Sequence, residues 1–403
     1  MSMRHGQVRR NLMIDVDLLR AQTPGVKKVT HFNNAGAALM PTPVIDAIQD
    51  YFESEILYGG YETHRKRANQ IEAAYQSLSE LIGADRSEVA LADNATRAWD
   101  VLFYALGLGK GDRIVTTSSE YVSNWAAYLH VRDRDGVIVD VAPDTRDGDV
   151  DVDALDAMVQ ERQTALITLN HMPTNGGLVN PAAAVGEVAS RHGVAYLLDA
   201  CQTVGQIPID VAEIGCDMLT GTSRKYLRGP RGVGFLYVKE AFLERLDPVF
   251  VEVENAPVVL EDSFTLAGGA HRFETWEKSY ANVAGFGAAV DYAMDIGIAQ
   301  MWERIQGLAS TMRHQLSMID GVTVHDRGRT RGGIVTFSVD SRQTLEVREL
   351  LAERSINVSV STPFSAPYDM RSRGIEGLVR ASVHAYNTDD EVDDLISAIQ
   401  ILA

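Results

Sequence analysis

The stretch Cys216-Asp-Met-Leu-Thr-Gly-Thr-Ser-Arg-Lys225 starts as a short apolar strand and ends in hydroxyl, guanidinium and amine side chains. The glycine-rich segment Arg228-Gly-Pro-Arg-Gly-Val-Gly234 follows it. Upstream, Val194-Ala-Tyr-Leu-Leu-Asp199 is a second apolar run, and it ends in an acid. Short apolar runs bounded by turn residues are typical of buried strands in a parallel sheet. The two runs therefore predict an acid and a lysine at the carboxyl ends of two strands, where such sheets bind ligands.

An acid and a lysine placed in this way suit the chemistry of pyridoxal 5'-phosphate. The amine of Lys225 would form a Schiff base with the aldehyde, and Asp199 would keep the pyridine nitrogen protonated. A buried carboxylate needs a cationic partner or several donors, and a pyridinium N–H supplies one. Gln202 would donate to the ring oxygen. The alternatives are an Asp199 that caps the next helix and a Lys225 that lies on the surface, but the nearby glycines and the upstream acid favour the cofactor.

Outward from these runs, short apolar strands alternate with helices of roughly a dozen residues, a pattern that predicts an α/β fold with a mainly parallel sheet. The predicted strands cover 89–92, 112–117, 137–141, 165–169 and 194–199, and the predicted helices cover 68–81, 95–106, 123–132, 151–162 and 182–192. A leading helix and connector are expected in 1–30. Beyond an irregular stretch at 240–275, a smaller α+β unit is expected, with helices at 281–318, 344–353 and 389–402 and strands at 332–339, 356–360 and 377–383.

Composition excludes several classes of function. The 403-residue chain carries a net charge of −18, which argues against nucleic acid and anionic membranes as partners. Two cysteines imply no disulfide framework. No apolar run approaches the length of a membrane span, and no signal-type apolar core follows the basic start, so we expect a cytoplasmic protein. We predict no metal site.

Further polar segments follow the predicted strands. Ala95 and Thr96 open a helix whose free N–H groups would bind a phosphate, although a plain helix cap is the commoner use of such residues. Tyr121 would stack on a flat ring, or lie in the core or at its rim. In the loop from His171 to Pro181, Thr174 or Asn175 would reach a phenolic oxygen and His171 would shuttle protons, unless the loop is simply a turn.

Charged and hydroxyl side chains would complete the site. Thr222 and Arg224, just before Lys225, would form a phosphate cup, and the nearby cation would help to lower the pKa of the lysine. Arg380 lies in an apolar strand, where an arginine needs a bidentate anion. That anion would be a substrate carboxylate or, alternatively, the carboxylate of a buried ion pair.

Together these motifs resemble the fold type I pyridoxal phosphate enzymes, in particular the class V aminotransferase and cysteine desulfurase superfamily. The resemblance runs from His31-Phe-Asn-Asn-Ala-Gly36 to Arg380-Ala-Ser-Val-His-Ala-Tyr-Asn-Thr388. It implies a large domain at 31–270 with a seven-stranded sheet, a small domain made of 1–30 and 271–403, and a homodimer in which residues around 273–276 reach a neighbour's site. It also implies roles for individual residues: an internal aldimine at Lys225, a pyridine partner in Asp199, ring contacts from Tyr121, Thr174 and Gln202, phosphate contacts from Ala95, Thr96, Thr222 and Arg224, and substrate contacts from Arg380, Asn34 and Ala35.

The chain departs from the desulfurases in one functional segment. Desulfurases carry a cysteine on a loop shortly before the arginine motif, whereas Val358-Ser-Val-Ser-Thr-Pro-Phe-Ser365 has none. The segments around His171 and Phe273 look more like the isopenicillin N epimerase-like and carbon–sulfur lyase branches. The resemblance therefore implies an enzyme acting on an amino acid through an external aldimine, with C–S β-lysis of an S-substituted cysteine as the leading hypothesis.

Several alternatives share the same residues. They are a class V aminotransferase, an epimerase or racemase, and a decarboxylating deaminase, because the outcome depends on bond orientation at the α-carbon and on which group reprotonates it. A non-catalytic binding protein on the same fold is a further hypothesis, which the intact Lys225, Asp199 and Gln202 disfavour. A nucleotide-binding oxidoreductase is disfavoured because no Gly-x-Gly-x-x-Gly follows the first strand.

Overall fold

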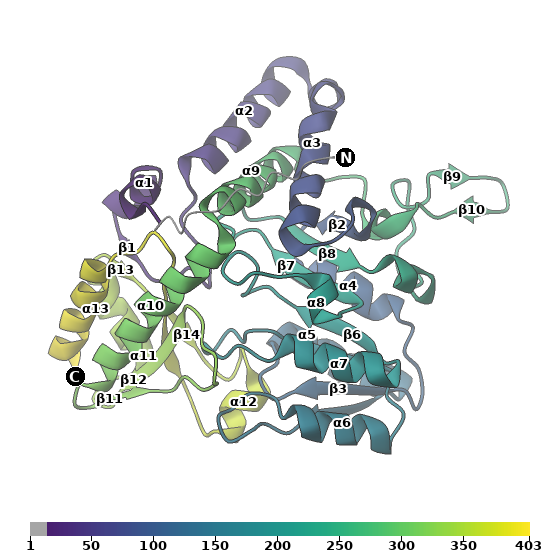
Figure 1. Ribbon diagram of the computed structural model, residues 1–403. Helices are drawn as coiled ribbons and strands as arrows, with labels where there is room; N and C mark the ends of the chain where they lie inside the picture. The colour runs from purple at the N-terminus through teal and green to yellow at the C-terminus, as the bar shows by residue number, and fades with distance from the viewer. Residues whose placement is uncertain (1–13) are drawn as a thin grey trace, which may run out of the picture.

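The computed structural model describes residues 14–403, and its centre is a seven-stranded sheet with the order β2-β8-β7-β6-β5-β3-β4 (Figure 1). Strand β8 runs antiparallel to its neighbours β2 and β7, and the remaining pairs are parallel. The predicted α/β fold with a mainly parallel sheet is confirmed. The strands are β2 (Val89–Ala92), β3 (Arg113–Thr117), β4 (Ile138–Ala142), β5 (Leu166–Asn170), β6 (Ala195–Asp199), β7 (Met218–Thr222) and β8 (Gly234–Val238).

Helices cover both faces of this sheet because successive side chains of each strand point to opposite sides. Ile114 and Leu166 belong to a core shared with α4 and α5, whereas Val115 and Ile167 belong to a core shared with α6 and α7. Each strand is therefore apolar on both faces, as expected for a parallel sheet. The helices are α4 (Ala95–Ala105), α5 (Val122–Asp135), α6 (Val152–Glu161), α7 (Ala182–His192) and the short α8 (Val211–Ile214).

A second, antiparallel sheet of four strands has the order β11-β12-β15-β14. The start of the described chain joins this unit, since β1 (Thr30–His31) pairs with β13 (Ile356–Asn357) and Arg20 of α1 (Val16–Ala21) forms an ion pair with Glu391. The predicted division into a large domain at 31–270 and a small domain made of 1–30 and 271–403 stays a prediction. The elements of the unit are β11 (Val322–Val324), β12 (Ile334–Val339), α11 (Thr344–Glu353), β14 (Ser359–Ser361), α12 (Pro367–Ser372), β15 (Leu378–Ser382) and α13 (Asp389–Leu402).

The prediction of one long helix over 281–318 is wrong. The segment forms two helices, α9 (Tyr280–Ile296) and α10 (Ile298–Ser317), and Gly297 between them has φ of 96°. A backbone in that region cannot continue a right-handed helix and favours glycine. The break lets α9 pack against α2 (Thr42–Tyr58) and α3 (Gly60–Ile82) while α10 turns to the small sheet.

Two other differences concern the periphery. The predicted helix at 68–81 corresponds to the part of α3 that follows a kink at Arg67, where φ is −109° and ψ is 17°. The helical segment of α3 before this kink and the whole of α2 were not predicted. The irregular stretch 240–275 contains a hairpin of β9 (Val258–Val259) and β10 (Phe264–Thr265), which projects from the body of the molecule (Figure 1). It also contains the short 3-10 helices η3 (Glu240–Arg245) and η4 (Gly269–Phe273). Within residues 14–403 no helix combines the length and apolarity needed to cross a membrane. Residues 1–13, the first part of the predicted leading segment, lie outside the described residues.

Candidate active site

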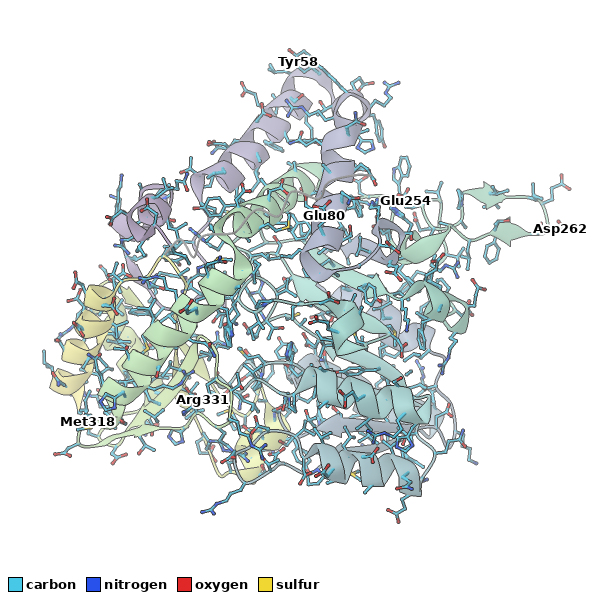
Figure 2. The ribbon with its side chains drawn as sticks, in the orientation of Figure 1. Tyr58, Glu80, Glu254, Asp262, Met318 and Arg331 are labelled. Carbon is cyan, nitrogen blue, oxygen red and sulfur yellow. The ribbon has the colours of Figure 1, made fainter. Side chains whose placement is uncertain are left out.

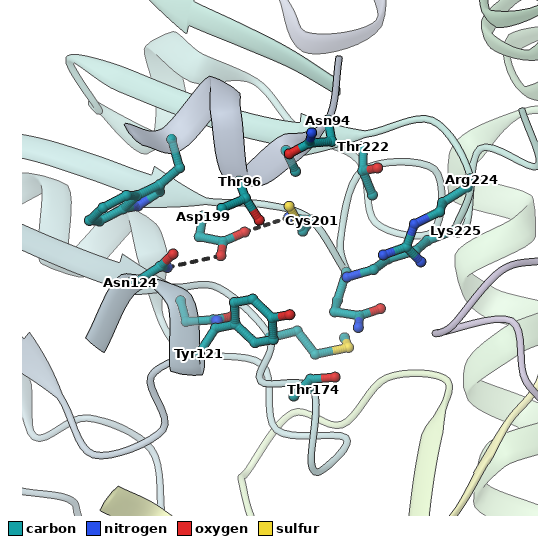
Figure 3. A pocket seen from close by; sticks show the side chains of 15 residues that line it. Asn94, Thr96, Tyr121, Asn124, Thr174, Asp199, Cys201, Thr222, Arg224 and Lys225 are labelled. Carbon is teal, nitrogen blue, oxygen red and sulfur yellow. Dashed lines mark hydrogen bonds between the residues drawn. The ribbon is translucent and has the colours of Figure 1, made fainter. Parts of the chain in front are cut away.

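A pocket with about 590 Å³ of empty space, part of it open to solvent, lies at the carboxyl ends of the central strands (Figure 3). Asn170, Asp199 and Thr222 are the last residues of β5, β6 and β7, so the parallel sheet brings them to one edge. The amino terminus of α4 closes one side. The lining residues are Asn94, Ala95, Thr96, Trp99, Tyr121, Asn124, Asn170, Met172, Thr174, Asp199, Cys201, Gln202, Thr222, Arg224 and Lys225.

Asp199 is a buried carboxylate with two uncharged donors. Its Oδ1 accepts from the backbone N–H of Cys201 at 2.9 Å, and its Oδ2 accepts from Asn124 Nδ2 at 3.1 Å (Figure 3). These bonds orient the carboxylate but bring no positive charge to it. A cationic N–H from a bound ring would complete the environment that a buried carboxylate needs.

Lys225 faces Asp199 across the pocket (Figure 3). Desolvation lowers the pKa of its amine to about 8, and the positive charge of Arg224 acts in the same direction. With a pKa of about 8, roughly a tenth of the amine is neutral at pH 7, far more than for an ordinary lysine. A neutral amine is the form that attacks an aldehyde or accepts a proton from carbon.

The amino end of α4 and the end of β7 lie where they could hold an anion. Ala95 and Thr96 lie in the first turn of α4, where backbone N–H groups have no acceptor within the helix. The Asn94 side chain caps the helix by accepting from Arg97 N at 2.9 Å, as the helix-cap interpretation predicts. This bond does not use the backbone N–H groups of Ala95 and Thr96, which precede Arg97. Thr222 and Arg224 approach from β7. The guanidinium of Arg224 also donates to the carbonyl of Gly36.

Flat and amide side chains line the pocket between these two ends. The ring of Tyr121 (Figure 3) supplies aromatic surface, and Trp99 is a second aromatic residue of the lining. Gln202 donates from Nε2 to the carbonyl of Ala35 at 3.2 Å, whereas its buried Oε1 has no partner among residues 14–403. A buried amide group without a partner is uncommon and indicates a group that a ligand or water would satisfy.

Two predicted residues lie behind the pocket wall. His171 is buried, and its Nδ1 lies 3.0 Å from Thr203 Oγ1. Burial lowers the pKa of His171 to about 4, so the ring is neutral near pH 7. Asn34 donates to the carbonyl of Ser382 at 2.7 Å and accepts from the hydroxyl of Tyr386 at 2.5 Å. Both side chains thus have protein partners, and their predicted roles remain predictions.

Arg380 is hydrogen-bonded to Thr174, which lines the pocket. Its Nη1 donates to the hydroxyl and the carbonyl of Thr174, at 2.7 Å and 3.0 Å, and its Nη2 donates to Asn33 Oδ1 at 3.3 Å. These partners are uncharged, so the structure does not place Arg380 in the alternative ion pair. Its buried Nε has no partner among residues 14–403. Ala35 is not among the residues that line the pocket, and its carbonyl accepts from Gln202, which does line it.

Sequence reasoning missed several lining residues. Trp99 lies one turn into α4 after Ala95, and Asn124 lies one turn into α5 after Tyr121, so helical spacing from the predicted residues would have found both. Asn170 ends β5 directly before His171, and its place at a strand end was the available signal. Met172 carried no such signal.

Comparison with known proteins agrees with this geometry. Residues 30–395 match the family described as aminotransferase class-V. A probable cysteine desulfurase of Halobacterium salinarum is 30% identical over 401 residues, which cover 96% of each chain. The structure of a cysteine desulfurase from Thermococcus onnurineus superposes with a TM-score of 0.90 at 24% identity, covering 97% of this chain and 98% of that one. A complex of the cystine C–S lyase C-DES with cysteine persulfide superposes with a TM-score of 0.84 at 24% identity, covering 94% and 99%.

The residues present fit the cofactor of this family. The pocket offers an amine with a lowered pKa, a buried carboxylate whose hydrogen-bond donors are uncharged, a helix terminus that could hold a phosphate, and aromatic walls. Pyridoxal 5'-phosphate would use the amine for a Schiff base, the carboxylate for its ring nitrogen and the helix terminus for its phosphate. The cofactor of the protein is therefore pyridoxal 5'-phosphate. The chain belongs to the aminotransferase class-V family and is related to the cysteine desulfurases.

Proposed function

We propose that the protein is a C–S β-lyase that cleaves an S-substituted cysteine without a catalytic cysteine. The observation that carries this proposal is the composition of the segment from β14 to α12, which supplies serine, threonine, proline and phenylalanine side chains and no thiol. A desulfurase mechanism through an enzyme persulfide needs a nucleophilic thiolate near the substrate sulfur. A lyase needs none.

The two cysteines of the chain are poorly suited to that nucleophilic role. Cys216 is buried in the core, where burial raises the pKa of its thiol. Cys201 lines the pocket, but burial and the neighbouring negative charge of Asp199 raise the pKa of its thiol well above the ordinary value. Thiols with raised pKa values are weak nucleophiles at neutral pH.

The residues of the pocket divide the work of a β-elimination. The bound cofactor supplies an electron-withdrawing ring that stabilises negative charge at the substrate α-carbon. Lys225 Nζ, whose pKa is lowered to about 8, would take the α-proton in its neutral form. Arg380, whose buried Nε has no partner in the described part of the chain, would hold the substrate carboxylate. Asp199 would hold a proton at the ring nitrogen, which preserves the electron demand of the ring.

The overall reaction is balanced by one water: an S-alkylcysteine and water give pyruvate, ammonia and the thiol. The cystine C–S lyase C-DES shows that this fold also hosts C–S cleavage in another protein. The alternatives remain transamination, epimerisation and decarboxylating deamination, which would use the same side chains.

Product analysis on a panel of S-alkylcysteines tests the proposal. Stoichiometric release of pyruvate, ammonia and thiol, without an added keto acid, is the expected result. If a keto acid forms only when an amino-group acceptor is added, the protein is a transaminase and the lyase proposal is wrong. Racemised substrate without pyruvate would indicate an epimerase, and released carbon dioxide would indicate a decarboxylase. The variant Lys225→Ala is the control for each product, because cofactor chemistry should stop in it.

We also propose that the protein is a homodimer. The hairpin of β9 and β10 exposes Val258, Val259, Leu260 and Phe264, each at least half exposed, and Asp262 marks its tip far from the body (Figure 2). An isolated two-stranded hairpin is marginally stable, and exposed apolar strand residues favour association. Trp276, in the segment for which the family resemblance implies contact with a neighbour's site, is 44% exposed.

Light scattering after size exclusion tests this proposal. The wild-type protein should have twice the chain mass of 44.1 kDa. The double variant Val259→Asp/Leu260→Asp should be monomeric, whereas Ile401→Asp, at an equally exposed apolar position of α13, should remain dimeric. A monomeric wild type, or a hairpin variant that stays dimeric, would contradict the proposal.

A further inference from the structure

The side chain of Asn124 joins two buried carboxylates. Its Nδ2 lies 3.0 Å from Glu120 Oε1 and 3.1 Å from Asp199 Oδ2. An amide nitrogen carries two hydrogens, so each carboxylate receives one of them. Asn124 itself is buried on the first turns of α5. Its orientation is therefore fixed by acceptors on both sides.

Glu120 is the second carboxylate, and it lies behind the pocket wall with an exposed fraction of 1%. Its oxygens accept from Asn124 Nδ2, from the backbone N–H of Tyr121 at 2.8 Å and from the hydroxyls of Thr116 and Tyr128 at 3.0 Å and 2.8 Å. These donors are uncharged. Burial, followed by the negative charge of Asp199, raises the pKa of Glu120. The titratable groups that face it are Asp199 and Tyr128.

The two hydrogen bonds to Asp199 fix its carboxylate so that its remaining lone pairs can accept a bond from the pocket. Cys201 N–H occupies Oδ1 and Asn124 occupies Oδ2, so rotation of the carboxylate is restricted. Its remaining lone pairs are available to a group in the pocket that Asp199 lines. The four donors to Glu120 favour its ionised form. The negative charge of Glu120, one amide away from Asp199, makes the potential at that place more negative, and a low-dielectric interior screens it weakly.

We propose that Glu120 and Asn124 are positioning residues that favour a protonated ring nitrogen in the bound cofactor by acting through Asp199. Asn124 holds the carboxylate in the orientation that receives the N–H. Glu120 holds Asn124 and adds a second negative charge. Glu120 also fixes the backbone of Tyr121, which brings that side chain to the same pocket. The inference rests on the assignment of the cofactor and not on which bond of the substrate is broken.

The test compares two cofactors that differ only at the ring nitrogen. Apoprotein is titrated with pyridoxal 5'-phosphate and with its 1-deaza analogue, which has a C–H in place of the ring nitrogen, and the dissociation constants are measured from absorbance. Wild-type protein should prefer the natural cofactor. Glu120→Gln and Asn124→Ala should each weaken its binding about tenfold, the effect of one lost charge-assisted interaction, and leave the analogue nearly unchanged.

A control separates this role from a packing role. Thr116→Val removes one donor to Glu120 but leaves the charge and the Asn124 bridge in place, so it should keep the preference for the natural cofactor. Equal weakening of both cofactors in Glu120→Gln and Asn124→Ala would show that the two residues only support the fold. No weakening of either would also overturn the proposal. Thermal melting of each apoprotein identifies a variant that does not fold. If Glu120→Gln or Asn124→Ala fails to fold, the comparison of the two cofactors in the remaining variant tests the proposal.

These outcomes are separate from those of the lyase proposal. Wild-type protein that binds the cofactor but releases no pyruvate would end the lyase proposal and leave this comparison intact. Wild-type protein that binds neither cofactor would instead contradict the cofactor assignment on which the inference rests.

Discussion

Nη1 of Arg380 donates to both the hydroxyl and the carbonyl of Thr174, at 2.7 Å and 3.0 Å. Arg380 lies on β15 of the small sheet, and Thr174 lies on the loop that follows β5 of the large sheet. The two sheets thus meet through a guanidinium that the family resemblance assigns to the substrate. Thr174 also lines the pocket, so one hydroxyl connects the arginine with the cofactor region.

Thr174→Val should weaken substrate binding. The change removes one hydrogen bond to a charged group and leaves the backbone bond, so we expect KM to rise about tenfold with little change in kcat. Thr174→Ser, which keeps the hydroxyl, should behave like the wild type. If Thr174 instead contacts the phenolic oxygen of the cofactor, the absorption spectrum of Thr174→Val will shift while KM stays constant. Steady-state kinetics and the spectrum together decide between the two roles.

Capture of the cofactor by apoprotein should depend on pH through Lys225. Because the pKa of this amine is lowered to about 8, its neutral fraction rises roughly tenfold per pH unit below pH 8 and levels off above it. The rate of reconstitution, followed by absorbance, should follow the same curve. An ordinary lysine would still be gaining neutral amine at pH 10.

Borohydride reduction identifies the amine. The reduced cofactor should remain on the wild-type chain and be absent from Lys225→Ala, as judged by intact mass. Lys239→Ala, a change at an exposed lysine just after β8, is the matched control and should retain the label. Loss of the label in Lys239→Ala, or its retention in Lys225→Ala, would contradict the assignment.

His171 should make the protein less stable in acid. Burial lowers its pKa from 6.5 to about 4 in the folded state, so between these values the unfolded chain binds the proton and the folded chain does not. The free energy of unfolding should therefore fall with falling pH, by about 1.4 kcal/mol per pH unit for this group.

Urea denaturation at pH 7, 6 and 5 measures this loss. His171→Asn should flatten the dependence, whereas a change at the exposed His314 should leave it as it is. The buried His384, whose pKa burial lowers to about 3, will contribute a similar slope that both variants keep. Identical slopes in wild type and His171→Asn would show that His171 is not held neutral by the fold.

Gly297→Ala should destabilise the protein. The residue has φ of 96°, and its new Cβ would also press on the side chain of Gln300. A left-handed conformation costs an L-residue about 1–2 kcal/mol. Gly307→Ala, in the middle of α10 with open space around the position, should instead stabilise the protein by about 0.5–1 kcal/mol. Denaturant midpoints, compared at unchanged m-values, measure whether each variant is less or more stable than the wild type. A stabilising effect of Gly297→Ala would refute the role of Gly297 in separating α9 from α10.

Much of the fold could be predicted from sequence because its signals are local. The apolar runs at 165–169 and 194–199 and the helix at 182–192 lie within a residue of the observed elements, since burial on both faces makes such strands continuously apolar. The break at Gly297 was missed because an isolated glycine inside an apolar helical pattern usually lowers helix stability without ending the helix. The direction of α10 depends on packing against a distant sheet, which no local pattern records.

By itself the sequence determined which side chains end the strands, because a parallel sheet brings strand ends to one edge whatever lies between them. Asp199 and Thr222, and Lys225 three residues beyond the end of β7, could be named on that ground. The tertiary structure alone decided the pairings across long separations: Thr174 with Arg380, and Glu120 with Asp199 through Asn124. The physical reason is that a buried polar group must find partners in three dimensions, and those partners come from elements whose order along the chain does not show which of them will meet.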